Sequence, residues 1–290
     1  MKRETWIFVG FLLITGMTIV ATSVGIASLY QKDAYLFTTL SGASVLIYGG
    51  GVYQHHTVSQ VYQVIPHDIV TLVFAVPLFI GSYISMRKNS GLGTLIFTGV
   101  TLYLFFSYAI YTFYAIFNQL FLAYVGIMGL SFYLFLSLIK AFDYEALLSN
   151  VNEKYRRKTN VFYLIGIPVL MGLVWLGDVI PTLFSGVVPQ SVLSHSWTLV
   201  PHAIDLAFLL PFVIVGGIHL YKGKALGYYL SYVIPVFLIL MMGAVLSKGV
   251  MLTITNTEFA YPMIIFIGSF FLLSIALFVL NIKALNNAKF

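Results

Sequence analysis

The sequence contains no cysteine and very little charge. Of its 290 residues none is Cys, and only 8% are Asp, Glu, Lys or Arg. The lack of cysteine excludes disulfides and thiolate metal sites, and it leaves the redox compartment undefined. The scarcity of charge excludes an ordinary soluble domain, in which about a quarter of the residues are charged. Because 60% of the residues are hydrophobic, the composition predicts an integral membrane protein.

Long apolar segments dominate the chain. A helix that crosses a bilayer needs about 20 predominantly apolar residues. Eight segments meet this requirement: roughly 6–29, 66–86, 92–116, 119–139, 161–182, 202–221, 225–250 and 260–283. The first follows Lys2 and Arg3 as a signal peptide would, but it is longer than a typical signal and has no small-residue cleavage site, so we interpret it as a retained helix. The sequence predicts an all-α membrane protein with eight transmembrane helices.

The basic residues fall on one side of these spans. With the amino terminus inside, the inner loops and ends hold thirteen of the fifteen Lys and Arg residues: Lys2, Arg3, Arg87, Lys88, Lys140, Lys154, Arg156, Arg157, Lys158, Lys222, Lys224, Lys283 and Lys289. The positive-inside rule then predicts a cell-membrane protein with cytoplasmic termini and basic loops. These loops are short and flank the spans, which argues against a nucleic-acid partner. The expected partner is the lipid bilayer.

The segment "AYLFTTLSGASVLIYGG" at 34–50 is apolar enough to suggest a ninth span. If it crossed the membrane while the amino terminus stayed inside, Arg87, Lys88 and the basic run at 153–158 would move outside. We therefore expect a re-entrant or interfacial segment on the outer face. Nine spans with the amino terminus outside is the alternative.

The two halves of the chain resemble each other. The polar stretch 142–160 is expected to be a cytoplasmic linker between a first four-helix repeat, 1–141, and a second, 161–290. The first repeat would carry a long outer loop at 30–65. A shift of 134 residues aligns Leu72 with Leu206, Phe74 with Phe208, Pro77 with Pro211, Lys88 with Lys222 and Gly93 with Gly227. Four spans per half predict parallel repeats, and chance similarity between apolar segments is the alternative.

Glycine and tyrosine suggest how the helices pack. Small residues let transmembrane helices approach closely, so we expect helix contacts at Gly10, Gly16, Gly126, Gly129, Gly166 and Gly172. Tyr108, Tyr111 and Tyr114 recur at every third position near the outer end of the third span, as interfacial anchors do.

Ionisable residues inside a membrane are costly and therefore suggest a functional site. Four of them fall within or at the outer ends of spans: Asp68, Asp178, Asp205 and Lys248. The last three belong to the second half at similar depth, so we expect an ion pair or a shared pocket. His202 lies one turn from Asp205 and joins this set with Trp175, while His67 and Asp68 occupy the matching place in the first half. A structural pair, a ligand pocket and a catalytic dyad are all compatible with the pattern.

Other chemistry has little support. Five histidines fall on the outer side, His55, His56, His67, His195 and His202, and they make a metal site a weak alternative because no HExxH or HxH spacing is present. No GxSxG motif indicates a nucleophile, and "YGGGVY" at 48–53 is not a phosphate loop. No cofactor can be assigned.

Part of the second half resembles a known pattern. The segments "WLGDVIPTLFSG" (175–186), "PHAIDLAFLLP" (201–211) and "GKALGYYLSYVIPVFLILMMGAVLSKG" (223–249) are similar to a group of uncharacterised bacterial polytopic membrane proteins with the pattern WLG[DE]xxP followed by DLxxxLP. That group has no known activity. The resemblance implies only that Asp178, Asp205 and Lys248 lie in its recognisable part.

These observations favour a multi-pass protein that binds or transports a small polar or amphipathic molecule. Its outward-facing pocket would lie in the second repeat. An enzyme acting on a lipid or isoprenoid head group at the outer leaflet, and a non-catalytic accessory subunit of a membrane complex, are the alternatives. Since no acidic residue is expected deep on the inner side, proton-coupled transport is disfavoured.

Overall fold

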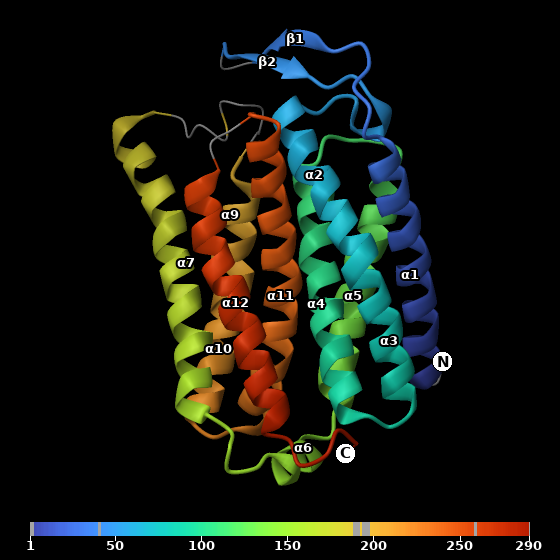
Figure 1. Ribbon diagram of the computed structural model, residues 1–290, viewed down its shortest axis with the longest axis vertical. Helices are drawn as coiled ribbons and strands as arrows, with labels where there is room; N and C mark the ends of the chain where they lie inside the picture. Colours follow the sequence, from blue (N-terminus) through green and yellow to red (C-terminus); the bar gives the residue numbers. More distant parts are fainter. Residues whose placement is uncertain (1–2, 40–41, 188–191, 193–197, 258–259, 290) are drawn as a thin grey trace.

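The chain folds into a bundle of long helices. The computed structural model describes residues 3–39, 42–187, 192, 198–257 and 260–289. In this part of the chain eight helical segments are long and apolar enough to cross a membrane, which confirms the eight predicted spans by length and composition. The helices run side by side, with both chain ends at one end of the bundle and a small β-hairpin at the other (Figure 1). We call these the terminal end and the hairpin end.

The helices follow the order of the chain. The first half contains α1 (Arg3–Ala27), α2 (Val58–Val70), α3 (Val76–Arg87), α4 (Gly91–Tyr114) and α5 (Phe121–Ala141). A short helix at the terminal end, α6 (Tyr144–Asn150), lies in the predicted linker. The second half contains α7 (Arg157–Ser185), α9 (Val200–Ile204), α10 (Leu210–Tyr221), α11 (Ala225–Ile254) and α12 (Tyr261–Lys283).

The second span of each half is interrupted by a π-helical turn. The turn η2 (Thr71–Ala75) joins α2 to α3, and the turn η3 (Asp205–Leu209) joins α9 to α10, so the two turns start 134 residues apart. Each is followed two residues later by a proline, Pro77 or Pro211. Proline has no N–H for the carbonyl four residues earlier, and widening the helix by one residue accommodates the ring. Such turns occur frequently at functional sites.

The segment 34–50 forms a hairpin rather than a helix. Strand β1 (Tyr35–Thr38) pairs antiparallel with β2 (Ser44–Ile47), and the pair lies beyond the helix ends (Figure 1). Of the residues described here, none makes a ninth span or re-enters the bundle. The glycine loop that follows packs tightly, since a Cβ on Gly49 would lie 1.9 Å from the carbonyl oxygen of Lys32. "YGGGVY" therefore anchors the hairpin to the chain that follows α1.

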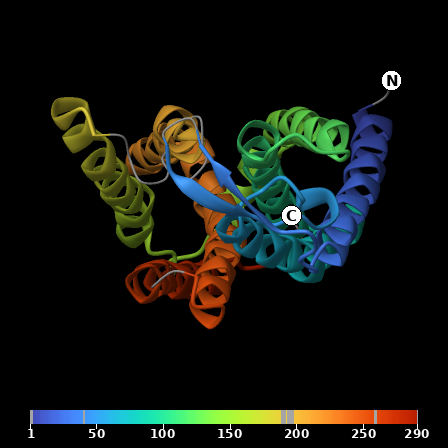
Figure 2. The same cartoon turned by 90° about the horizontal axis from the view of Figure 1, so that it is seen from above.

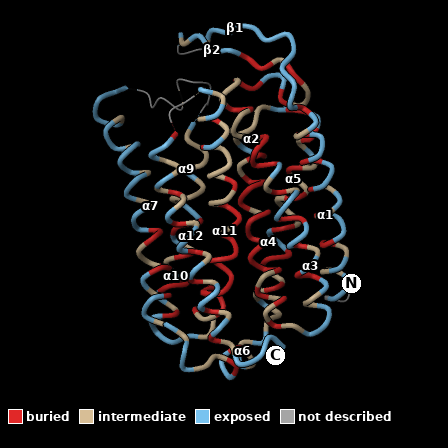
Figure 3. The backbone as a smooth tube through the Cα atoms, in the orientation of Figure 1, coloured by how far each residue is buried: buried red, intermediate tan, exposed pale blue. Residues whose placement is uncertain are grey.

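Two helices, α4 and α11, form the centre of the molecule. In the candidate spans of these two helices 78% and 61% of the residues are buried, against 17–33% in the others. Buried residues concentrate along these two helices (Figure 3). Gly99 of α4 lies against the backbone of α11 near Val233, and the Tyr229 hydroxyl donates a hydrogen bond of 2.9 Å to Thr98. Viewed from above, the helices before and after α6 form two groups (Figure 2), and α11 packs against both α2 and α4 between them.

The expected glycine contacts are wrong in part. A Cβ added to Gly10, Gly16 or Gly129 would meet nothing within 4 Å, so no neighbouring helix approaches closely at these positions. Close approach occurs elsewhere: Gly93 lies against Ser85 and Met86, and Gly227 lies against His219 and Leu220. All three positions of the first contact recur 134 residues later in the second. The helix-to-helix crossing after the basic turn is thus the same in both halves.

Candidate functional site

A polar cluster joins α7 to the interrupted span α9–η3 near the hairpin end; we call it the α7–α9 cluster. The Nε2 atom of His202 lies 3.1 Å from Oδ2 of Asp178, and the Trp175 indole N–H donates a 3.0 Å hydrogen bond to Asp205. The rings of Trp175 and His202 have centroids 4.0 Å apart. The structure thus brings together four of the residues predicted for the site.

The local sequence explains why these residues meet. Trp175 and Asp178 are three positions apart in α7, so both project from one face of that helix. His202 and Asp205 have the same spacing where α9 passes into η3. Two matched pairs on facing helices produce two contacts, one between imidazole and carboxylate and one between indole and carboxylate.

The cluster is open on the α7 side. The side chain of Asp178 is 51% exposed, whereas that of its partner His202 is 11% exposed. Asp178 lies seven residues before the end of α7, which is about 10 Å along the axis. A helix of 29 residues is longer than the roughly 30 Å hydrocarbon core. A bilayer centred on α7 would place Asp178 near the boundary between head groups and acyl chains.

A second polar cluster surrounds Asp68 and is closed. Tyr53 donates a 2.6 Å hydrogen bond to one carboxyl oxygen of Asp68, and Tyr111 donates a 2.8 Å bond to the other. Asp68 is 2% exposed and Tyr53 is fully buried. Burial, followed by the charge of Asp68, raises the pKa of Tyr53 well above its ordinary value, so its hydroxyl remains a donor. This Asp68 cluster connects the loop before α2 with α2 and α4.

His67 belongs to the same cluster. Its Nε2 atom lies 3.2 Å from both the Ser107 hydroxyl and the Tyr103 hydroxyl, and Tyr103 also lies 2.7 Å from the Thr71 hydroxyl. The other ring nitrogen, Nδ1, is buried without a hydrogen-bond partner. Polar residues of α2 thus bind mainly to α4, whereas those of α9 bind to α7.

Lys248 forms no ion pair with the acids of the second half. Its charge interacts with the carboxylate of Asp68, without an ion pair between the two. The ion pairs within the described residues are His202–Asp178 and Arg87–Glu4, so the expected pairing of Lys248 with Asp178 or Asp205 does not occur there. Lys248 lies six residues before the end of α11, a helix that packs against α2 and α4.

The described histidines that were candidates for a metal site do not come together. In the described chain no group of three or more His, Cys, Asp or Glu side chains could hold a metal ion. His67 and His202 lie in different clusters, His56 accepts a hydrogen bond from the backbone N–H of Ile116, and His55 is exposed. His195 lies outside the described residues.

Sequence reasoning missed several members of the Asp68 cluster. Tyr108 and Tyr111 were expected at the membrane interface, but they are 2% and 7% exposed and face the core. A regular three-residue tyrosine spacing on a helix that also carries Ser107 is the signal that could have indicated a buried hydroxyl network. Tyr53 donates a hydrogen bond to Asp68, and a Cβ on Gly25 of α1 would lie 2.1 Å from the same carboxylate. The sequence carries no signal for these two contacts, because they depend on how three separate segments pack.

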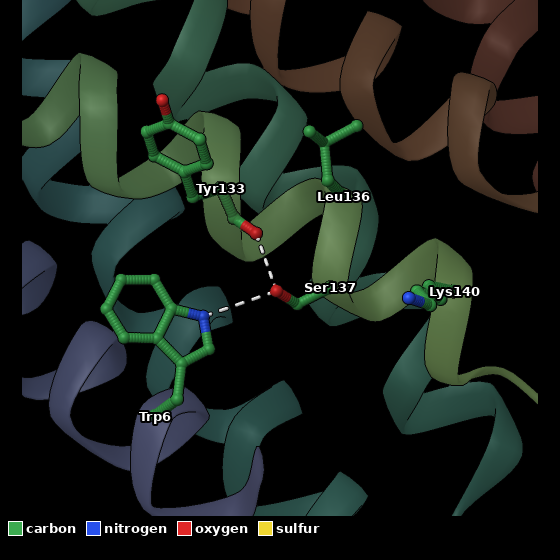
Figure 4. A pocket seen from close by; sticks show the side chains of 5 residues that line it. All are labelled: Trp6, Tyr133, Leu136, Ser137 and Lys140. Atoms are coloured by element: carbon green, nitrogen blue, oxygen red, sulfur yellow. Dashed lines mark hydrogen bonds between the residues drawn. The ribbon is translucent and has the colours of Figure 1, made fainter. Parts of the chain in front are cut away.

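Two hollows in the surface are lined by no residue of the α7–α9 cluster. One, at the terminal end between α1 and α5, is lined by Trp6, Tyr133, Leu136, Ser137 and Lys140, with the Trp6 indole bonded to Ser137 (Figure 4). The other, at the hairpin end, is formed by parts of 24–33 and 49–54 together with Gln119. Tryptophan, tyrosine and lysine at a helix end are typical of interfacial anchoring.

The two clusters differ in what their carboxylates can still bind. The Asp68 carboxylate accepts a hydrogen bond from a hydroxyl on each oxygen and is shielded from solvent, while Asp178 has one partner and a half-exposed side chain.

Comparison with protein-family models, curated proteins and solved structures finds no match for this chain.

Proposed function

We propose that this protein binds a small polar or amphipathic molecule at the α7–α9 cluster. The observation that carries this proposal is the exposure of Asp178 inside a candidate span, beside a His202 that is buried. An ionisable group facing lipid is expensive. A pair that only specified helix packing would be shielded from lipid on both sides. The open side of Asp178 is where a ligand would replace water or lipid.

The Asp68 cluster has a structural role in this proposal. Its hydrogen bonds are directed inward, and its members come from α2, α4 and the loop before α2, with Lys248 contributed by α11. A buried polar group makes a core rigid and specific where it is satisfied, as both carboxyl oxygens of Asp68 are. The first half would thus hold the framework against which the second half binds its ligand.

We further propose that the fold consists of two parallel four-helix repeats, 1–141 and 161–290, joined by the linker 142–160. The matched π-helical turns and the matched contacts of Gly93 and Gly227 support this, because both recur at the 134-residue shift found in the sequence. Chance similarity of apolar composition would not reproduce a helix irregularity and a backbone contact together. The central α4–α11 pair is where an axis along the membrane normal would run.

The proposed orientation places the terminal end in the cytoplasm of the cell and the hairpin outside. Arg87, Lys140, Arg157 and Lys283 all lie at or near the ends of their helices on the terminal side. The positive-inside rule supports a cytoplasmic location for that end. The α7–α9 cluster would then face outward.

Binding or sensing fits this arrangement better than proton-coupled transport. The polar contacts of the second half toward the terminal end involve amides and hydroxyls, such as Asn160 with Asn281 and Tyr163 with Ser274. Asp178 and Asp205 lie near the hairpin end. A relay through carboxylates would need acids at both depths, and α7, α10, α11 and α12 carry none toward the terminal end.

Native mass spectrometry of the protein purified in a mild non-ionic detergent tests the proposal. We expect the wild type to carry a bound small molecule that the variant Asp178→Asn/Asp205→Asn loses. The matched control is Asp33→Asn, which removes a carboxylate at the hairpin end, far from the cluster in sequence and at a position with φ of 51°, a conformation that Asn tolerates. Retention of the same molecule by the double variant, or its absence from the wild type, would contradict the proposal.

A further inference from the structure

The α7–α9 cluster carries an excess of negative charge. With both carboxyls ionised, Asp178 and Asp205 contribute two negative charges, and His202 can balance at most one of them. Lys248, the basic side chain expected to compensate, forms no ion pair with Asp178 or Asp205. Neither ion pair of the described residues brings Lys or Arg to this cluster. A ligand that enters without positive charge would leave that excess uncompensated in a region of low dielectric.

The remaining free groups of the cluster also suit a cation. Trp175 presents an aromatic ring beside the two carboxylates, and indole is the ring that binds cations best. Pro181 has no N–H to donate to the carbonyl of Gly177, which directly precedes Asp178 and so offers a further acceptor. His202 is buried, and its Nδ1 atom has no hydrogen-bond partner. That nitrogen is a polar atom in the cluster that the protein itself leaves unsatisfied.

The surroundings of the cluster are apolar and open to lipid. Leu183 and Phe184 of α7 and Phe208 of η3 are strongly exposed. In a bilayer centred on α7 the cluster lies near the boundary between head groups and acyl chains, so a molecule with an apolar chain could present its head group to Asp178 while the chain stays among the lipids. A purely water-soluble ion would gain nothing from these side chains.

We infer that the ligand is an amphipathic cation, an amine or quaternary ammonium head group on an apolar chain, held between Asp178 and Asp205 and against the Trp175 ring. This inference rests on the proposed function, because it names the ligand class of the same site. The carboxylates supply the charge, the indole face the cation–π contact, and the exposed apolar residues the chain contact.

Fluorescence of Trp175 tests the inference directly. Replacing Trp6 and Trp197 by Phe leaves Trp175 as the one indole in the chain. In dodecyl maltoside micelles, which carry no charge, we would titrate dodecyltrimethylammonium, dodecanoate and dodecanol, and also tetramethylammonium, which has the head group without the chain. We expect a saturable change with dodecyltrimethylammonium only, and an apparent affinity about tenfold weaker in Asp178→Asn/Asp205→Asn.

Controls separate the loss of charge from the loss of fold. The variant Asp178→Glu keeps the charge and should keep binding, and Asp33→Asn should bind as the parent does, with circular dichroism checking helicity in each. If dodecanoate or dodecanol binds as tightly as the cation, the cationic class is wrong although a ligand site exists. Tight binding of tetramethylammonium would overturn the requirement for a chain. If no probe changes Trp175 saturably, the inference fails, and the mass-spectrometric comparison still decides on binding as such.

Discussion

Gly25 lets α1 approach the carboxylate of Asp68. A Cβ at this position would lie 2.1 Å from the Oδ2 atom of Asp68 and 2.7 Å from the Tyr53 hydroxyl. Neither atom can move aside without breaking the 2.6 Å hydrogen bond between them. One absent methyl group therefore determines whether the first span can close over the Asp68 cluster.

Substituting this glycine should destabilise the protein. We expect Gly25→Ala to lower the free energy of unfolding by about 1–3 kcal/mol, because the added methyl overpacks a fixed polar contact. Gly16→Ala on the same helix is the matched control: nothing lies within 4 Å of its Cβ, and alanine favours a helix over glycine by roughly 1 kcal/mol at most. Unfolding by dodecyl sulfate in mixed micelles, followed by circular dichroism, measures both. Equal effects of the two substitutions would refute the close contact.

At the scale of single residues, the sequence indicated the acids but not their partners. Asp68, Asp178 and Asp205 are recognisable because charge inside an apolar segment is rare. The pairing of Trp175 and Asp178 with Asp205 and His202 follows in part from their equal spacing. The place of Lys248 could not be predicted, since it depends on the rotation of α11 about its own axis, which the packing of α2 and α4 determines.

Helix α11 contains a proline, and a side chain of another helix replaces the hydrogen bond that this proline cannot make. Pro235 cannot donate to the carbonyl of Ser231, and the Asn281 side chain of α12 donates to that oxygen instead at 2.9 Å. Asn281 also exchanges two hydrogen bonds with Asn160 of α7, at 2.9 and 2.8 Å. The buried Asn281 side chain thus connects α12 to both α7 and α11.

Removing that side chain should expose the defect in α11. We expect Asn281→Leu to lower the free energy of unfolding by about 1–3 kcal/mol, since the Ser231 carbonyl and the Asn160 amide lose their partner while buried. Adding Pro235→Ala should recover part of the loss, because alanine supplies the missing N–H. The same mixed-micelle unfolding assay compares the single and double variants. If Pro235→Ala gives the same change in wild type and in Asn281→Leu, the two sites are independent and the explanation is wrong.

At the scale of elements, the ends and connections of the spans could not be predicted from the sequence. The second span was predicted to begin at 66, but its helix begins at Val58, where Thr57 and Gln60 form a capping box. Polar residues such as Ser59 and Gln63 fail an apolar-run criterion although they continue the helix beyond the lipid. The hairpin at 34–50 was missed because four-residue strands in an apolar segment resemble a short span. The sign of the π-helical turns in the sequence is the proline that follows each of them.

Contact between the halves could not be predicted from the sequence. The proposed 134-residue shift pairs positions of one half with positions of the other, but the packing of α11 against both α2 and α4 depends on shape along whole helices. The consequence is a molecule with one continuous core, centred on α4 and α11, rather than two separate bundles.

The absence of cysteine makes the orientation of the whole molecule directly measurable. Single cysteines at Gln31, Gln54 and Ser149 would occupy exposed positions before the hairpin, after it, and in α6. With a membrane-impermeant maleimide we expect Gln31→Cys and Gln54→Cys to label in intact cells, and Ser149→Cys only after permeabilisation. The cysteine-free parent is the blank. Labelling of Gln31→Cys and Gln54→Cys from opposite sides would mean that 34–50 crosses the membrane.

The central position of α11 has a consequence for how the protein is made. It is the seventh of the eight candidate spans, so α2 and α4 leave the ribosome long before the helix that covers them. Until α11 arrives, the faces of α2 and α4 that it covers, including the Thr98 hydroxyl, lack the helix that buries them. A chain that ends in the linker at 142–160 would leave these faces uncovered.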